Sequence, residues 1–158
     1  MGAHEHLNPQ EFQDDVEHWG VTADRGHESG QRLRAQMLLR ADEAPTLYRG
    51  FAAGRPQYPS PDQFKPGSVL SLPMSSFSED PEVSESFSWT DDDDDSYSPT
   101  TMEVTGARGI PISPEKFAWQ KEWLSEGDFE IEDVEEIPEP GFETPAYHLR
   151  ARWRHFGM

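Results

Sequence analysis

The 158-residue sequence contains no cysteine, which excludes disulfide bonds, thiol catalysis and most zinc sites. Long apolar runs are also missing, since no stretch approaches the ~20 residues that a membrane-spanning helix needs. The first ten residues, MGAHEHLNPQ, hold neither a basic nor an apolar segment, so no signal peptide is visible. We therefore expect a cytoplasmic protein, in the producing or the target cell, with no membrane partner.

Basic residues are few as well. Thirteen Lys and Arg stand against 31 Asp and Glu, which gives a formal net charge of −18. Phosphate backbones repel a chain with this charge, so nonspecific binding to nucleic acid is not expected. The charge fits simple solubility, binding to a basic protein, or mimicry of the charge of DNA.

Apolar residues make up only 34% of the chain, but five Trp, nine Phe and four Tyr supply large side chains for a small core. The length suggests a single domain, and no internal repeat is visible. We expect a flexible tail over residues 1–7 and one domain over 8–158, helical over 8–44 and strand-rich over 45–158. We expect this domain to be a monomer.

The spacing of apolar and turn residues predicts helices first and strands afterwards. Asn8 and Pro9 begin a helix over residues 8–19, Gly20 ends it, and a second helix covers 28–41. The remaining expected elements are a short helix over 80–89 and strands over 46–51, 68–73, 76–78, 100–106, 108–112, 120–124, 128–137 and 146–156. Because helices and strands are segregated, the sequence indicates an α+β fold with antiparallel sheets.

The last two expected strands carry opposite charges. The first is acidic, and the second presents a row of arginines that includes Arg150 and Arg152. A slip in the alternation before Val134 indicates a β-bulge. Opposite charges on paired strands contribute about 0.2–1 kcal/mol for each pair, which favours mutual pairing. An anion site formed by Arg150 and Arg152 is the alternative.

Histidines and aspartates are present, but not at the spacing that a metal site needs. The run Asp91–Asp95 lacks the spaced ligands, turn glycine and distal glutamate of a calcium loop, and a solvated loop is expected there. His4 and His6 have no second pair of ligands. There is also no nucleophile elbow and no glycine-rich phosphate loop. We therefore expect no metal.

Two separated segments carry polar groups that need an explanation. In LYRGF, Arg49 lies within an apolar, aromatic strand, where its guanidinium either offers a planar fork to a phosphate or extends to water from a sheet edge. Further along, Ser76 and Ser78 alternate with Phe77, so both hydroxyls share one face of a strand, and a helix follows. Serines at such a place also serve simply as turn residues.

The third segment is FAWQKEWL, in which Gln120 and Glu122 point to the same face if the segment is a strand. In this order the segments resemble the mono-ADP-ribosyltransferases of the arginine–serine–glutamate class, over about residues 45–155. The family's elements read here as Tyr48-Arg49-Gly50, as Ser76-Phe77-Ser78 with Phe87, and as Phe117 through Gln120-Lys121-Glu122 with a glycine turn at Gly127. The middle motif has phenylalanine where the family usually has threonine.

This resemblance implies a fold and a co-substrate. The fold would be N-terminal helices packed on a split pair of antiparallel or mixed β-sheets, a β-sandwich core. The co-substrate would be NAD, from which ADP-ribose passes to a macromolecular acceptor, as in a toxin or effector; the short helical part fits a minimal domain of viral or polymorphic-toxin origin. The residues implied in NAD binding are Arg49, Gly50, Ser76, Ser78 and Phe87.

The resemblance also implies that Glu122 is the catalytic carboxylate and that Gln120 helps to choose the acceptor. The Gln-x-Glu spacing is most similar to small toxins that modify an asparagine of GTPases, although glutamine also accompanies guanine acceptors in the family. Phe117 and Trp119 would contact the target, or else pack in the core. The acidic charge favours a protein acceptor over nucleic acid. The alternatives are NAD hydrolysis by the same fold, and an acidic, non-catalytic interaction protein or DNA mimic.

Overall fold

The computed structural model describes residues 9–22, 26–54, 58–86, 98–112, 121–138 and 144–156. In this part of the chain, helices α1 (Pro9–Thr22) and α2 (Glu28–Arg40) come first. The elements that follow are β1 (Asp42–Glu43), β2 (Leu47–Ala53), the 3-10 helix η2 (Pro61–Gln63), β3 (Val69–Ser78), α3 (Pro81–Ser86), β4 (Ser98–Thr105), β5 (Arg108–Pro111), β6 (Glu122–Ile137) and β7 (Ala146–His155). The predicted tail over 1–7 lies outside the described residues.

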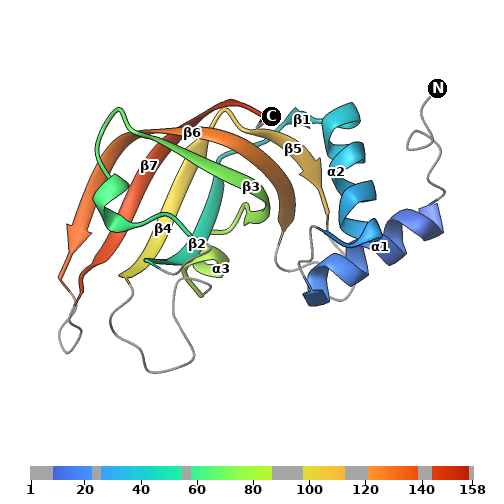
Figure 1. Ribbon diagram of the computed structural model, residues 1–158, viewed down its shortest axis with the longest axis horizontal. Coiled ribbons are helices and arrows are strands. Elements are labelled where there is room, and N and C mark those ends of the chain that lie inside the picture. The colour runs from blue at the N-terminus through green and yellow to red at the C-terminus, as the bar shows by residue number, and fades with distance from the viewer. Residues whose placement is uncertain are drawn as a thin grey trace.

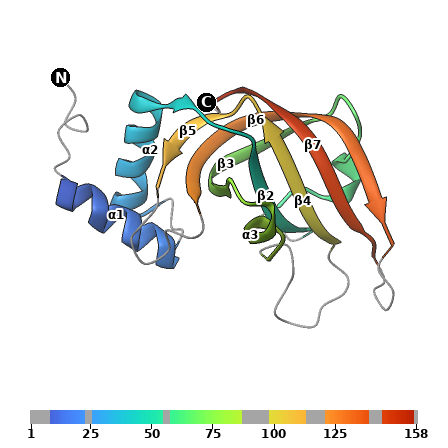
Figure 2. The ribbon, with the colours of Figure 1, turned by 180° about the vertical axis from the view of Figure 1, so that it is seen from behind.

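Seven strands within the described ranges form one sheet in the order β1-β5-β6-β3-β2-β4-β7. An additional β6–β7 pairing closes this sheet on itself, and β4–β7 is its parallel pair. Helices α1 and α2 stand at one end, beside β5 and β6 (Figures 1 and 2). The predicted α+β class is confirmed, and the closed, barrel-like sheet is compatible with the split β-sandwich that was expected.

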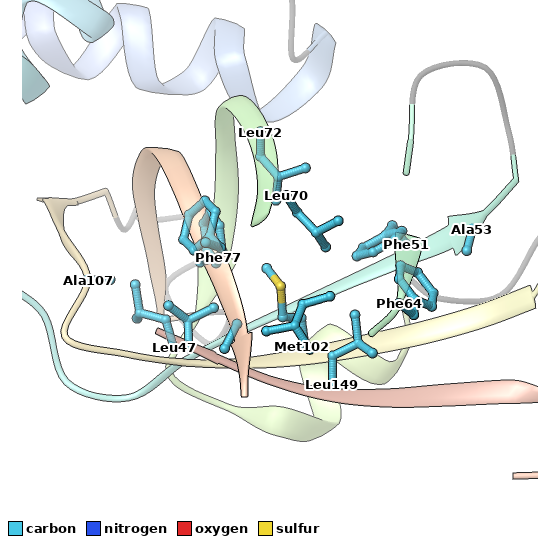
Figure 3. Close-up of a cluster of buried hydrophobic side chains, with 14 of the residues drawn as sticks. Leu47, Phe51, Ala53, Phe64, Leu70, Leu72, Phe77, Met102, Ala107 and Leu149 are labelled. Atoms are coloured by element: carbon cyan, nitrogen blue, oxygen red, sulfur yellow. The ribbon is translucent and has the colours of Figure 1, made fainter. Parts of the chain in front are cut away.

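The closed sheet encloses one cluster of buried side chains, which we call the barrel core. It includes Leu47, Phe51, Phe77, Met102 and Leu149 (Figure 3). A second cluster, the helix-side core, lies between the helices and the strands β3, β5 and β6. Its buried members are Val16, Trp19, Leu33, Met37, Met74, Ile110, Ile112 and Leu124.

An irregularity in β3 decides which side chains face the helices. Leu70 and Leu72 belong to the barrel core, whereas Met74 belongs to the helix-side core. The pairing register with β6 shifts between Leu72 and Ser75, at Pro73, which has no N–H to donate to a neighbouring strand. Because the shift reverses the alternation, Phe77 joins the barrel core and the adjacent serine positions turn toward the helices.

The oppositely charged strands β6 and β7 are paired, as the sequence predicted. Arg150 Nη2 lies 3.4 Å from Asp133 Oδ2, and Arg152 Nη2 lies 3.6 Å from Glu132 Oε2. The register shifts between Ile131 and Asp133, which confirms the bulge expected before Val134. Both arginines of the alternative anion site therefore contact carboxylates.

Two expectations about glycine were wrong. Helix α1 continues through Gly20 to Thr22, because a glycine inside a helix costs only about 0.5–1 kcal/mol and the packed helix tolerates it. Gly127 does not form a turn but lies inside β6, so the strands expected over 120–124 and 128–137 are one strand. Its φ is +133°, and a Cβ there would lie 2.0 Å from the carbonyl oxygen of His155.

Among the described residues, no helix combines the length and the apolar character that are needed to cross a lipid bilayer.

We predict that Gly127→Ala destabilises the protein by about 2–4 kcal/mol, because an L-residue at positive φ is strained and its Cβ overlaps the β7 backbone. Gly106→Ala is the matched control, since Gly106 also has positive φ (+72°) but open space around it. Denaturant unfolding of both variants measures the difference. Equal losses of stability would mean that the close approach of β7 is unimportant.

Candidate active site

The candidate site is built on three strands that are neighbours in the sheet, β6, β3 and β2. Arg49 lies in β2, and its Nη1 donates a hydrogen bond to the carbonyl oxygen of Ser76 in β3, at 3.0 Å. The guanidinium carbon also lies 5.9 Å from the centre of the Tyr58 ring. Arg49 is therefore directed across the sheet toward β3, and it is not an edge arginine that only extends into water.

Ser76 and Glu122 meet through the register of β3 and β6. Ser78 lies opposite Glu122, and Ser76 lies opposite Leu124, so Ser76 and Glu122 are diagonal neighbours across the pair. The Ser76 hydroxyl donates a short hydrogen bond to Glu122 Oε2. Residues that are far apart in the sequence thus place a hydroxyl and a carboxylate in direct contact.

Glu122 is buried, with 7% of the residue exposed. Burial raises the pKa of its carboxyl above the ordinary value, while the hydrogen bond from Ser76 and the positive charge of Arg49 act in the opposite direction. The Arg49 charge is therefore close enough to act on Glu122. The three residues form one electrostatic unit, which we call the Arg–Ser–Glu cluster: Arg49, Ser76 and Glu122.

A fourth residue contacts this cluster from the helices. The indole Nε1 of Trp19, in α1, donates a hydrogen bond to Ser76 Oγ at 2.8 Å. Sequence reasoning missed this contact, because a tryptophan near the end of an amphipathic helix equally fits ordinary core packing. Its only signal is position: a large aromatic residue on the helix that precedes the sheet.

The other predicted cofactor-binding residues in the described ranges have structural contacts. Ser78 Oγ accepts a hydrogen bond from the Asp80 backbone N–H at 2.9 Å, and Asp80 Oδ1 accepts one from the Glu82 N–H at 2.9 Å. These bonds shape the turn into α3. Gly50 is buried in β2, opposite Thr101. The roles of Ser78 and Gly50 in NAD binding stay predictions.

The predicted residues Phe87, Phe117, Trp119 and Gln120 lie outside the described residues, as do His4, His6 and Asp91–Asp95. The structure does describe the residues on either side of positions 113–120, Ile112 and Lys121. The Ile112 N–H donates to the Glu122 carbonyl oxygen at 2.8 Å, and the Lys121 carbonyl accepts from the Glu79 N–H at 3.1 Å. Lys121 has φ +46°, a conformation that is uncommon for a residue other than glycine.

Within the described ranges, His, Asp and Glu side chains do not gather into a group of three or more that could hold a metal ion. The groups of the Arg–Ser–Glu cluster have a chemistry of their own. A guanidinium binds an anionic group through its fork, and a buried carboxylate stabilises positive charge that develops beside it. A hydroxyl bonded to that carboxylate fixes its orientation.

No protein-family model matches the sequence, and no curated protein matches it. Solved structures do match its fold. The Vis toxin, an ADP-ribosyltransferase from Vibrio splendidus, is similar with a TM-score of 0.67 and 17% identity, over 96% of this chain and 76% of that chain. An ADP-ribosyltransferase from Clostridium botulinum is similar with a TM-score of 0.56 and 14% identity, over 91% of this chain and 86% of that chain.

Exoenzyme S from Pseudomonas aeruginosa, in a complex with human 14-3-3 protein beta and bound to carba-NAD, is similar with a TM-score of 0.51 and 17% identity, over 87% of this chain and 66% of that chain. Agreement over about nine-tenths of the chain at such low identity establishes the architecture. The chain therefore has the fold of the ADP-ribosyltransferase toxins, and Arg49, Ser76 and Glu122 meet within that fold.

Proposed function

We propose that this protein is an NAD-dependent mono-ADP-ribosyltransferase of the arginine–serine–glutamate class that acts as a toxin. The observation that carries the proposal is the contact of Arg49 with Ser76 and of Ser76 with Glu122, on three adjacent strands. The fold is that of ADP-ribosyltransferase toxins. The cluster adds to the fold, because a backbone architecture does not by itself supply an arginine, a serine and a glutamate at these positions.

The cluster fits the chemical groups of NAD. The guanidinium fork of Arg49 suits the pyrophosphate. The Ser76 hydroxyl, on β3, lies beside the Glu122 carboxylate. Exoenzyme S, of similar fold, has been solved bound to carba-NAD. We infer that this protein binds NAD across β2, β3 and β6, with the pyrophosphate at Arg49 and the nicotinamide ribose at Glu122.

The reaction follows from the charges. Cleavage of the bond between nicotinamide and C1′ of the ribose leaves the electron pair on nicotinamide and positive charge on the sugar, as in glycoside cleavage. The Glu122 carboxylate stabilises this charge electrostatically and accepts a hydrogen bond from a ribose hydroxyl. The acceptor then forms a bond to C1′ and loses a proton.

The acceptor is proposed to be a protein side chain. A chain with net charge −18 repels the phosphates of DNA and RNA, and Gln120 stands where the family has glutamate with arginine acceptors. Phe117 and Trp119, which precede Glu122 in the sequence, are proposed to contact the target. We expect a monomer that needs no metal.

The non-catalytic alternative, an acidic interaction protein or DNA mimic, explains the net charge but not the cluster. Burying a carboxylate beside a guanidinium costs folding free energy, and a surface that only mimics charge does not need it. NAD hydrolysis differs from transfer only in the acceptor, which would be water. A measurement of nicotinamide release covers both reactions, because both release nicotinamide.

We predict that Glu122→Gln lowers the rate of nicotinamide release from NAD by roughly 10²–10³-fold, because the amide cannot offset positive charge on the ribose. Glu130→Gln is the control, since Glu130 lies on the same strand but forms an ion pair with Arg154 of β7. Release of nicotinamide is measured by chromatography, with and without a lysate. The proposal fails if the unaltered protein releases none at a concentration where a known transferase completes the reaction.

The pH dependence of the reaction rate should follow the ionisation of the Glu122 carboxyl. If the ionised form is active, the rate falls as the pH drops through the pKa of Glu122, which burial places above the ordinary glutamate value. Ser76→Ala removes a hydrogen bond that lowers this pKa, so the acid limb of the kcat profile should move to higher pH. A limb that stays in place, or moves to lower pH, would contradict the assignment.

Arg49→Lys should raise the KM for NAD roughly tenfold or more, because lysine keeps the charge but loses the planar fork. The control is Arg150→Lys, on the exposed face of β7, where the Arg150 side chain forms an ion pair with Asp133. Initial rates at varied NAD concentration separate KM from kcat. Equal KM values in the two variants would remove Arg49 from the binding site.

A further inference from the structure

Trp19 makes a contact that the proposed mechanism does not use. It is almost fully buried, at 2% exposure, in the helix-side core with Met74 and Leu124. Packing alone would be satisfied by any large apolar ring. Yet its indole Nε1 lies 2.8 Å from Ser76 Oγ, the hydroxyl that donates a hydrogen bond to Glu122.

The chemistry of the three groups fixes the direction of each hydrogen bond. An indole N–H is a donor only, so Ser76 Oγ must accept from Trp19. A hydroxyl has one proton to donate, and the partner left for it is Glu122 Oε2. The chain of bonds therefore runs in one direction, from Trp19 to Ser76 to Glu122.

Several charged and titratable groups lie on the elements that surround this chain of bonds. Arg49, on β2, is the charge that acts on Glu122. On the helices, Asp15 is bound by Arg32 through two hydrogen bonds, and His18 stacks on His27. On β6, Glu126 accepts a hydrogen bond from Arg34, and just after the end of β3, Glu79 Oε2 accepts one from the indole of Trp123. Each of these groups other than Arg49 thus has a partner outside the Arg–Ser–Glu cluster.

We propose that Trp19 is a positioning residue of the active site: by donating to Ser76 Oγ, it commits the Ser76 proton to Glu122 Oε2. Oε1 of Glu122 is then the atom that accepts a hydrogen bond from a sugar hydroxyl of the substrate. Helix α1 thereby takes part in the site without contacting the reacting atoms. The part of this inference that concerns catalysis depends on the proposed function, whereas the hydrogen-bond chain does not.

The test removes the indole N–H of Trp19 and keeps an aromatic ring at that position. In Trp19→Phe, the Ser76 hydroxyl loses its donor and is free to rotate away from Glu122, so the ionised carboxylate loses stabilisation. A ¹³C NMR titration of the Glu122 carboxyl, assigned with Glu122→Gln, should show titration at higher pH in Trp19→Phe than in the unaltered protein. This readout does not need enzymatic activity.

A double-mutant cycle identifies the route of the effect. In a Ser76→Ala background, Trp19→Phe should produce no further shift of the Glu122 titration. The matched control is Trp153→Phe, whose indole donates to the Glu126 carbonyl oxygen at 2.9 Å, and it should titrate like the unaltered protein. A shift of the same size in both backgrounds, or no shift in either, would overturn the proposal.

Two further experiments distinguish an effect on folding from an effect on function. If Trp19→Phe unfolds, site-specific replacement of Trp19 by 3-benzothienylalanine, which has sulfur in place of N–H, keeps the shape and gives the same test. If nicotinamide is released, Trp19→Phe should lower kcat/KM at neutral pH about threefold to tenfold and move the acid limb to higher pH. An NMR shift without any nicotinamide release would support the hydrogen-bond chain and contradict the proposed function alone.

Discussion

The structure of the site depends on one partly buried contact, the hydrogen bond from Ser76 to Glu122. A carboxylate with so little exposure is costly unless polar partners surround it. Here the hydroxyl of β3 contacts it directly and the guanidinium of β2 acts on it. Strand β3 lies next to β6 in the sheet and β2 lies next to β3, so the order of the strands and the irregularity in β3 are what make the cluster possible.

The same face of β6 also binds the helices. Glu122 and Glu126 are separated by Leu124, which packs in the helix-side core, and alternate residues of a strand share a face. Glu126 is bound by Arg34 of α2, and Glu122 is linked through Ser76 to Trp19 of α1. The helices thus contact β6 through the apolar side chain of Leu124 and through one polar contact on each side of it. A shift of α1 would disturb the orientation of the Glu122 carboxylate.

The α+β fold and the three residues of the Arg–Ser–Glu cluster were predictable from the sequence. The role of Trp19 and the position of Gly127 were not, for physical reasons. Three motifs in order, through their resemblance to the arginine–serine–glutamate ADP-ribosyltransferases, pointed to Arg49, Ser76 and Glu122, whereas each motif alone equally fits a structural role. The direction of Trp19 was not predictable, since periodicity locates a buried face but not the atom that a side chain contacts. Glycine at position 127 indicates a turn, because the sequence does not show that the carbonyl oxygen of His155, at the end of β7, lies within 2.0 Å of where a Cβ would be.

We propose that Arg49, Ser76 and Glu122 surround one dinucleotide. This proposal is best tested by a crystal structure of the protein with carba-NAD, an analogue already seen with exoenzyme S. We expect the pyrophosphate to lie within hydrogen-bonding distance of the Arg49 guanidinium, and a ribose hydroxyl to lie within hydrogen-bonding distance of the Glu122 carboxylate. A dinucleotide that occupies another face of the sheet, or no binding at millimolar concentration, would contradict it.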